Sequence, residues 1–142
     1  MNIKWLLAIC FNFLVITMVS CQDDEDVPKA VLEAFHEMYP DEDDPDFEKD
    51  SHGYWEAHFK IDGEKYRADF HADGSWRETE NSIKEKNLPT VTLKAIKKIY
   101  GNEEITEVEH VLSAKNGEFY DVEFKRKGKN KDVRFRLDGT TF

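Results

Sequence analysis

The two halves of this 142-residue chain repeat one pattern, and the repeat constrains the fold more than any other feature. Val27-Pro28 matches Leu88-Pro89, and Tyr39 matches Tyr100, both 61 residues further along. Two copies are too few for a solenoid, so we expect a single pseudo-symmetric domain. The other matches lie 65 residues apart, which places a four-residue insertion in the second copy: Trp55, Phe59, Phe70 and Asp73-Gly74 correspond to Tyr120, Phe124, Phe135 and Asp138-Gly139.

Each copy opens with a predicted helix. Pro28 and Pro89 stand near the first helical turn, where the missing N–H of proline costs nothing. Pro40 ends the first helix, and Gly101 is the expected C-terminal cap of the second. Apolar residues recur at helical spacing and predict the two faces that pack on the core: Ala30, Val31, Ala34, Phe35 and Met38, then Val91, Ala95, Ile96 and Ile99.

After each helix, apolar and polar residues alternate, which is typical of strands buried on one side. Asp62-Gly63 marks a two-residue hairpin turn. This turn sets a register that places apolar pairs on one face: Phe59 with Tyr66, Ala57 with Ala68 and Trp55 with Phe70. Asp73-Gly74 leads into another strand over residues 75–80. The second copy repeats the hairpin, and each copy has one extra strand: Tyr120, Val122 and Phe124 lie against Val133 and Phe135, and Phe47 and Val108 begin the extra strands.

These elements predict an α+β fold in which two tandem helix-plus-antiparallel-hairpin repeats form one two-layer domain. We expect repeat one over residues 27–81 and repeat two over residues 82–142. An antiparallel sheet can bury one face and leave the other in water, so we expect both helices on one face and an open polar face opposite. The alternative is two separate halves joined at residues 81–87.

The N-terminal segment predicts export. Lys4 precedes an apolar run from Trp5 to Val19, which is the layout of a secretory signal and too short for a comfortable membrane span. Met18-Val19-Ser20-Cys21 resembles the lipobox of bacterial lipoproteins, in which the cysteine carries the lipid. We therefore expect a signal peptide over residues 1–20, lipidation at Cys21 and an acidic tether over residues 21–26. The acidic run resembles the surface-export signal of Bacteroidota lipoproteins.

This interpretation places the protein at the outer membrane, facing the periplasm or the cell surface, with the lipid as its only membrane contact. The alternatives are an ordinary signal peptide cleaved elsewhere and an uncleaved anchor with a free Cys21. Because Cys10 leaves with the signal and Cys21 carries lipid, the mature fold has no pair for an internal disulfide.

Charge is distributed unevenly along the chain. Residues 21–81 hold 20 acidic and 6 basic side chains, whereas residues 82–142 hold 10 acidic and 13 basic ones. This balance disfavours a nucleic-acid partner and favours cationic or amphoteric ones. The acidic run over residues 41–44 is typical of a solvated loop.

Motifs of enzymes and cofactors are missing from the sequence. It has no Gly-x-Ser-x-Gly, no His-Glu-x-x-His and no glycine loop that would cradle a phosphate. Once the signal is removed, no cysteine has a catalytic neighbourhood. We therefore predict that the protein is not an enzyme and has no cofactor.

The predicted register also places polar pairs on the open face: His58 opposite Arg67, Glu56 opposite Asp69 and Tyr54 opposite His71. Two carboxylates directly opposite one another are unfavourable unless a positive charge relieves them. Arg67 can do this alone, or a divalent cation can do it, held by Glu56, His58 and Asp69. The matching pair in the second copy is Asp121 and Arg134, an ordinary ion pair, so a metal site would belong to the first copy only.

Trp76 has two possible placements. If Asp73-Gly74 forms a plain two-residue hairpin, Trp76 lies opposite His71 and completes an exposed row with Tyr54, a typical protein-binding anchor. A single bulge would turn Trp76 into the core instead, because one residue of slip changes its face. We take five residues as candidate protein-binding residues: Tyr54, His58, Arg67, His71 and Trp76.

The pattern over residues 27–142 resembles the PepSY-like proteins of Bacteroidota, which are also described as β-lactamase-inhibitor-like. The positions that carry the resemblance are structural ones: Val27-Pro28, Val31, Ala34-Phe35, Tyr39-Pro40, Trp55, Phe59, Tyr66, Phe70, Asp73-Gly74, Trp76, Thr79-Glu80 and Leu88-Pro89. The resemblance implies tandem helix-plus-sheet units with a concave sheet that, in the inhibitor proteins, docks onto an enzyme. PepSY domains proper are associated with restraining peptidases in the envelope.

We therefore expect a non-enzymatic envelope lipoprotein that binds, inhibits or restrains another envelope protein, such as a hydrolase or peptidase, through its open sheet face. The alternative is an envelope module that binds a small ligand or a metal on that face.

Overall fold

A computed structural model describes residues 26–142 of the chain. The predicted signal peptide and the lipidation site Cys21 lie outside these residues. Within them, neither α-helix is long and apolar enough to cross a membrane. The elements in chain order are α1 (Lys29–Met38), β1 (Asp46–Lys49), β2 (Trp55–Ile61), β3 (Glu64–Phe70), β4 (Trp76–Ser82), the 3-10 turn η1 (Glu85–Asn87), α2 (Thr90–Tyr100), β5 (Ile105–Ser113), β6 (Gly117–Phe124) and β7 (Lys131–Arg136).

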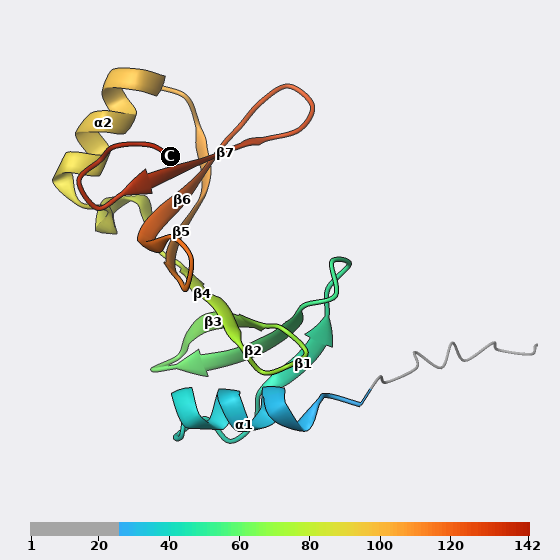
Figure 1. The fold of residues 1–142 in the computed structure, drawn as a ribbon. Helices are drawn as coiled ribbons and strands as arrows, with labels where there is room; N and C mark the ends of the chain where they lie inside the picture. Colours follow the sequence, from blue (N-terminus) through green and yellow to red (C-terminus); the bar gives the residue numbers. More distant parts are fainter. Residues whose placement is uncertain (1–25) are drawn as a thin grey trace, which may run out of the picture.

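The seven strands form one antiparallel sheet in which the order of strands follows the order of the chain (Figure 1). Strands β4 and β5 pair across the boundary between the two repeats, with Glu78 opposite Ser113 and Ser82 opposite Glu109. The alternative of two separate halves is therefore wrong, because the backbone hydrogen bonds of the sheet continue from one repeat into the other.

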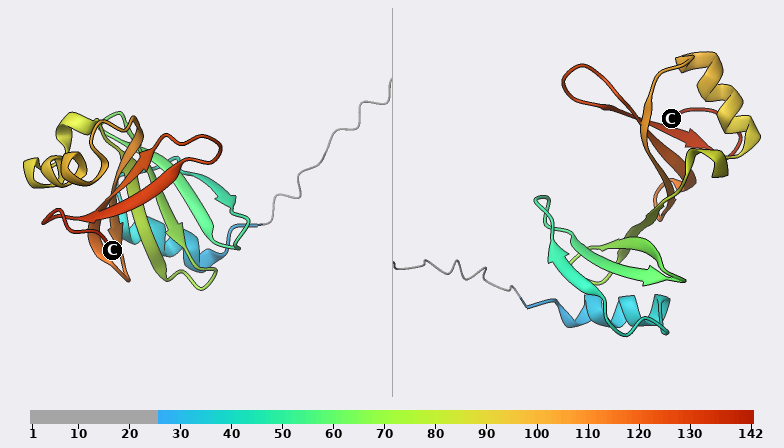
Figure 2. Two further views of the ribbon diagram at one scale, coloured as in Figure 1. Left: turned by 90° about the horizontal axis from the view of Figure 1, so that it is seen from above. Right: turned by 180° about the vertical axis from the view of Figure 1, so that it is seen from behind.

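Both helices lie on the same face of the sheet, one over each repeat (Figures 1 and 2). Val31 and Phe35 of α1 pack on the first core, and Ile96 of α2 packs on the second. The α+β two-layer fold is thus confirmed. The buried strand residues are Trp55, Ala57, Phe59, Ala68 and Phe70 in the first core, and Val108, Val122, Phe124 and Phe135 in the second.

The predicted core-facing sides of the helices are wrong at three residues, which lie at the surface. Met38, Val91 and Ile99 are 40%, 45% and 56% exposed. In α2 the row that faces the sheet is Thr92 and Ile96, and residues 91, 95 and 99 form the neighbouring row of the helix. Thr92 is fully buried, and a polar residue at such a position cannot be distinguished from a surface residue by hydropathy.

The predicted hairpins are confirmed. In the first, Asp62 and Gly63 adopt φ angles of 52° and 83°, as expected of the left-handed two-residue turn that matches the twist of a hairpin. The predicted pairs of β2 and β3, including Phe59 with Tyr66 and Glu56 with Asp69, are all present. In the second hairpin, Val122 lies opposite Val133 and Tyr120 opposite Phe135.

Trp76 packs against the first core, so of its two placements the bulge is the one that the structure adopts. Asp69 pairs with Glu78 and Phe70 pairs with Trp76, which leaves Arg77 as the extra residue of β4. The Trp76 indole N–H donates a hydrogen bond of 2.9 Å to Thr79, whose hydroxyl lies 2.6 Å from that of Tyr39. Trp76 therefore does not join Tyr54 and His71 in an exposed row on the open face.

Candidate functional site

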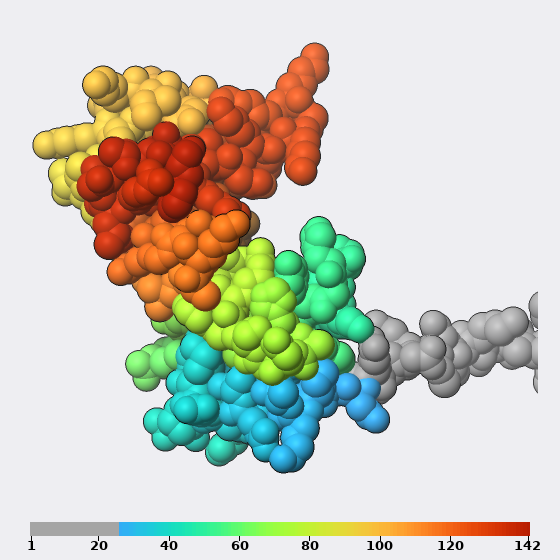
Figure 3. Space-filling model, in the orientation of Figure 1, coloured from blue at the N-terminus to red at the C-terminus, as the bar shows by residue number. Residues whose placement is uncertain are grey.

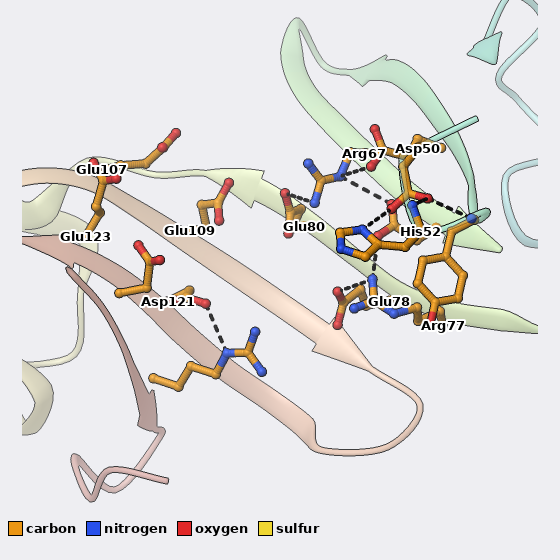
Figure 4. Close-up of a pocket in the computed structure, with 15 residues that line it drawn as sticks. Asp50, His52, Arg67, Arg77, Glu78, Glu80, Glu107, Glu109, Asp121 and Glu123 are labelled. Atoms are coloured by element: carbon orange, nitrogen blue, oxygen red, sulfur yellow. Dashed lines mark hydrogen bonds and ion pairs between the residues drawn. The ribbon is translucent and has the colours of Figure 1, made fainter. Parts of the chain in front are cut away.

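The open face of the sheet is hollowed into a groove of about 540 Å³. In Figure 3 the outline is hollowed between the strands of the first repeat and the β6–β7 hairpin. Strands from both repeats contribute to the groove, and its lining is almost entirely charged. It is lined by ten carboxylates, three guanidiniums, an imidazole and a phenol: Asp50, Glu56, Asp69, Glu78, Glu80, Glu107, Glu109, Asp121, Glu123 and Asp132; Arg67, Arg77 and Arg134; His52 and Tyr54 (Figure 4).

In the first repeat, two arginines neutralise the carboxylates. The Nε of Arg67 lies 3.2 Å from one carboxylate oxygen of Asp69, and Nη1 of Arg77 donates to the other at 2.8 Å. Arg67 also reaches Glu80 at 2.8 Å, and Arg77 reaches Glu78 at 2.6 Å. The side chain of Asp69 is only 3% exposed, and this burial raises its pKa while Arg67 opposes the rise. Arg67 therefore relieves the opposed carboxylates, one of the two alternatives that the sequence left open.

His58 contacts acidic residues of β1 and β2 instead of Asp69. Its Nε2 is 3.1 Å from a Glu48 oxygen and 3.5 Å from a Glu56 oxygen. The predicted trio of metal donors is therefore not assembled as expected, since Glu48 of β1 replaces Asp69. Oxygen and nitrogen atoms of Glu48, Glu56 and His58 lie within 4.8 Å of one another. Glu48 could not be found from the sequence, because the pairing of β1 with β2 was unknown.

Tyr54 and His71 are in contact, as the register predicts. Their rings meet edge to face with centroids 5.1 Å apart. The Arg77 guanidinium lies 4.6 Å from the centre of the Tyr54 ring and occupies the place that Trp76 was expected to take. Arg77 could not be found from the sequence, because only the bulge in β4 brings it to this face. The role of Tyr54, His58, Arg67 and His71 in protein binding stays a prediction.

Two carboxyl groups meet at the seam between the repeats. Glu80 of β4 and Glu109 of β5 lie close enough for each to shift the pKa of the other. Burial, followed by the negative charge of Glu109, raises the pKa of Glu80 to about 8. Burial also raises the pKa of Glu109. At neutral pH the seam therefore holds a proton that a pair of exposed glutamates would have lost.

Across the seam, the acids of the second repeat that line the groove have few positive charges beside them, although this repeat as a whole is basic. Arg134 reaches Asp121 at 3.1 Å. Within residues 26–142, no lysine or arginine nitrogen lies within 4.0 Å of the carboxylates of Glu107, Glu109 or Glu123. One oxygen of Asp121 is buried without a hydrogen-bond partner among the same residues. The ion pair of Asp121 with Arg134 is as predicted. Glu107, Glu109 and Glu123 could not be found from the sequence, because the pairing of β4 with β5 was unknown.

The comparisons with known proteins match this architecture. A family model described as "Putative beta-lactamase-inhibitor-like, PepSY-like" matches residues 18–61 and 54–141, two overlapping segments that together span both repeats. No curated protein matches the chain.

Three crystal structures of Bacteroides proteins share the fold. A BLIP-like protein from Bacteroides fragilis is 24% identical, with a TM-score of 0.70 over 81% of this chain and 83% of that one. A DUF2874 family protein from Bacteroides ovatus is 20% identical, with a TM-score of 0.72 over 80% and 83%. A "putative periplasmic" protein from Bacteroides eggerthii is 18% identical, with a TM-score of 0.71 over 81% and 85%. The match of the family model to both repeats shows that this chain belongs to the PepSY-like, beta-lactamase-inhibitor-like family.

Proposed function

We propose that this chain is a non-enzymatic envelope protein that binds another protein through its open sheet face. The observation that carries the proposal is the groove: a concave face, uncovered by either helix, that both repeats line with charged side chains. Membership of a beta-lactamase-inhibitor-like family and the BLIP-like structural neighbour support a protein partner, such as a hydrolase. The role of the protein toward that partner is to inhibit or restrain it.

The location that we propose is the envelope, with the protein held by lipid on Cys21 and residues 27–142 as the binding domain. The lipobox-like residues before Cys21 and the structural neighbour described as periplasmic support this location. Several acyl chains contribute about 0.8 kcal/mol for each buried methylene, which is enough for a stable anchor. The folded domain then needs no membrane-binding surface of its own.

Crosslinking in the native host tests the proposal. The bait is the full chain with an affinity tag, and acyl labelling that is lost in Cys21→Ser establishes its anchor first. We expect a stoichiometric crosslinked partner, and we expect Tyr54→Ala with His71→Ala to lower its yield at least fivefold, because these two rings, one half-buried and one exposed, form an aromatic contact at this face.

The matched control changes His36 and Ile99 to alanine, two exposed helical residues. Equal loss of the partner in both variants, or no partner at all, contradicts the proposal. Adding the purified protein to the captured enzyme then shows whether binding lowers its activity.

A second function, metal binding, is favoured by the donor atoms of Glu48, Glu56 and His58. One imidazole and two carboxylates suit zinc, which takes nitrogen and oxygen ligands at about 2.0–2.2 Å. We expect Zn²⁺ to raise the melting temperature of the full chain by a few degrees, and His58→Ala to abolish the rise. His110→Ala is the control, because His110 pairs with a single carboxylate, Glu118. An unchanged melting temperature with Zn²⁺ excludes this function.

A further inference from the structure

We propose that the segment of the partner protein that enters the groove is cationic, presenting two or more lysine or arginine side chains to the carboxylates of the second repeat. This inference rests on the proposed function, because it names the chemistry of the protein that the open face binds. The occupant is a loop, helix or chain end of another protein, and its positive charges lie against Glu107, Glu109 and Glu123.

The positive charges of the groove are already paired, and several of its carboxylates are not. Its three guanidiniums are already engaged, since Arg67 and Arg77 lie against the first-repeat carboxylates and Arg134 lies against Asp121. A neutral or acidic partner would bury the remaining carboxylates without counter-charges, and the loss of their hydration would weaken its binding. A cationic partner would pair with them as it displaces their water.

The carboxylates of the second repeat are grouped along one side of the groove. In Figure 4 the carboxylates of Glu107, Glu109, Asp121 and Glu123 come from the two neighbouring strands β5 and β6 and lie around one hollow. The buried oxygen of Asp121 has no hydrogen-bond partner among the described residues. Lysine and arginine are donors without acceptors, and a guanidinium can bind two carboxylate oxygens at once. The groove therefore offers acceptors in the arrangement that such side chains use.

The carboxyl pair of Glu80 and Glu109 at the seam holds a proton that a bound cation would displace. Glu80 is faced by Arg67 and Asp69 on β3 and by Glu109 on β5, and Glu109 is faced in turn by Glu107 and Asp121. A cation placed here stabilises the ionised form of Glu80 and lowers its pKa, so binding expels the shared proton. The affinity for a cationic segment should therefore rise between pH 6 and pH 8.

A second copy of this chain also carries a basic segment. Residues 125–131, the loop between β6 and β7 with the residue that begins β7, contain five lysines and arginines. Lys125 and Arg126 already pair with Glu104 and Glu103 of their own repeat, which leaves only the remainder of this loop for another molecule. Lys131 lies over the Tyr100 ring, so this loop can present only Lys127 and Lys129 to another molecule. The occupant that we propose is a different protein, as in the proposed function, and self-association is an outcome of the test.

The test uses the purified full chain and a fluorescently labelled hexalysine peptide, with labelled hexaserine and hexaglutamate as comparison peptides. We expect hexalysine alone to bind, with a dissociation constant that falls at least threefold from pH 6 to pH 8. Replacing Glu107, Glu109 and Glu123 together by glutamine should weaken binding at least tenfold. The matched control replaces Glu37, Glu64 and Glu85 by glutamine. These residues are exposed and do not line the groove, so the control should weaken binding of hexalysine less than twofold.

No binding of hexalysine, or equal weakening in the two triple variants, overturns the inference, since the net charge of −10 alone would then explain any attraction. Dimers in sedimentation velocity that vanish when residues 127 and 129 are changed to serine overturn the choice of another protein as occupant. A crosslinked partner that depends on Tyr54 and His71 but not on the three glutamates leaves the proposed function intact and removes only this inference.

Discussion

Replacing Gly74 by alanine is expected to lower the free energy of unfolding by about 2–5 kcal/mol, against about 1–2 kcal/mol for Gly63→Ala. Both glycines have a left-handed backbone, with φ of +85° and +83°. They differ in their surroundings: a Cβ on Gly74 would lie 2.5 Å from the carbonyl oxygen of Ala30, whereas one on Gly63 has nothing within 4 Å. Gly63→Ala therefore reports the backbone strain alone, and the difference between the variants reports the clash.

The clash is costly because both sides of the contact are held in place. Ala30 lies in the first turn of α1, so its carbonyl cannot move without the helix. On the other side, the Asp73 carboxylate accepts hydrogen bonds of 2.9 Å and 2.6 Å from the backbone N–H and the hydroxyl of Ser75. Urea denaturation measures the effect. Equal losses in Gly74→Ala and Gly63→Ala would show that the turn can shift away from α1.

The second repeat has the same close approach of a glycine turn to a helix, with slightly more space between them. A Cβ on Gly139 would lie 3.0 Å from the carbonyl oxygen of Val91, and Asp138 accepts from Thr140 as Asp73 accepts from Ser75. The Asp-Gly match between the two repeats thus corresponds, in each repeat, to a contact between a turn and the helix of the same repeat.

The wild-type protein is expected to lose stability between pH 5 and pH 8, and replacing Glu80 by glutamine is expected to remove most of this loss. Burial and Glu109 raise the pKa of Glu80 in the folded protein from its ordinary 4.5 to about 8, so over this range the folded state binds more protons than the unfolded state. Stability from this group is fully present below pH 4.5 and is lost as the pH rises to 8.

The size of this decline follows from the shift. At 1.36 kcal/mol per pKa unit the full shift corresponds to about 4–5 kcal/mol, and we expect about 2–3 kcal/mol because the pair is partly exposed and shares its proton. Denaturation by urea at pH 5, 6.5 and 8 measures it. Glu80→Gln should match the wild type within about 1 kcal/mol at pH 5 and exceed it at pH 8.

Glu85→Gln is the control, because Glu85 is an exposed glutamate beyond the end of β4. A Glu80→Gln protein whose stability falls with pH as steeply as that of the wild type would show that the seam carries no bound proton. A variant that is less stable than the wild type at pH 8 would show that the pairing of Glu80 with Arg67 outweighs its burial.

The local register could be predicted because it depends on neighbours in the chain. Asp62-Gly63 determines which residues of β2 and β3 face each other, and this turn alone is enough to place His58 opposite Arg67 on the open face. The placement of Trp76 could not be decided from the sequence, because both arrangements satisfy the same hydropathy pattern. The bulge at Arg77 turns Trp76 toward the core while residues 78–80 keep the register of a plain hairpin.

The sequence by itself determined the repeat, the helix-and-hairpin units and the faces of their strands, because periodicity and turn residues act over a few positions. Only the tertiary structure decided how the repeats meet. Strands β4 and β5 are joined through η1 and α2, and such a long connection leaves their register free until both cores are packed. That register brings Glu80 against Glu109 and completes the acidic groove, so the site arises from the pairing of the two copies and is absent from either one alone.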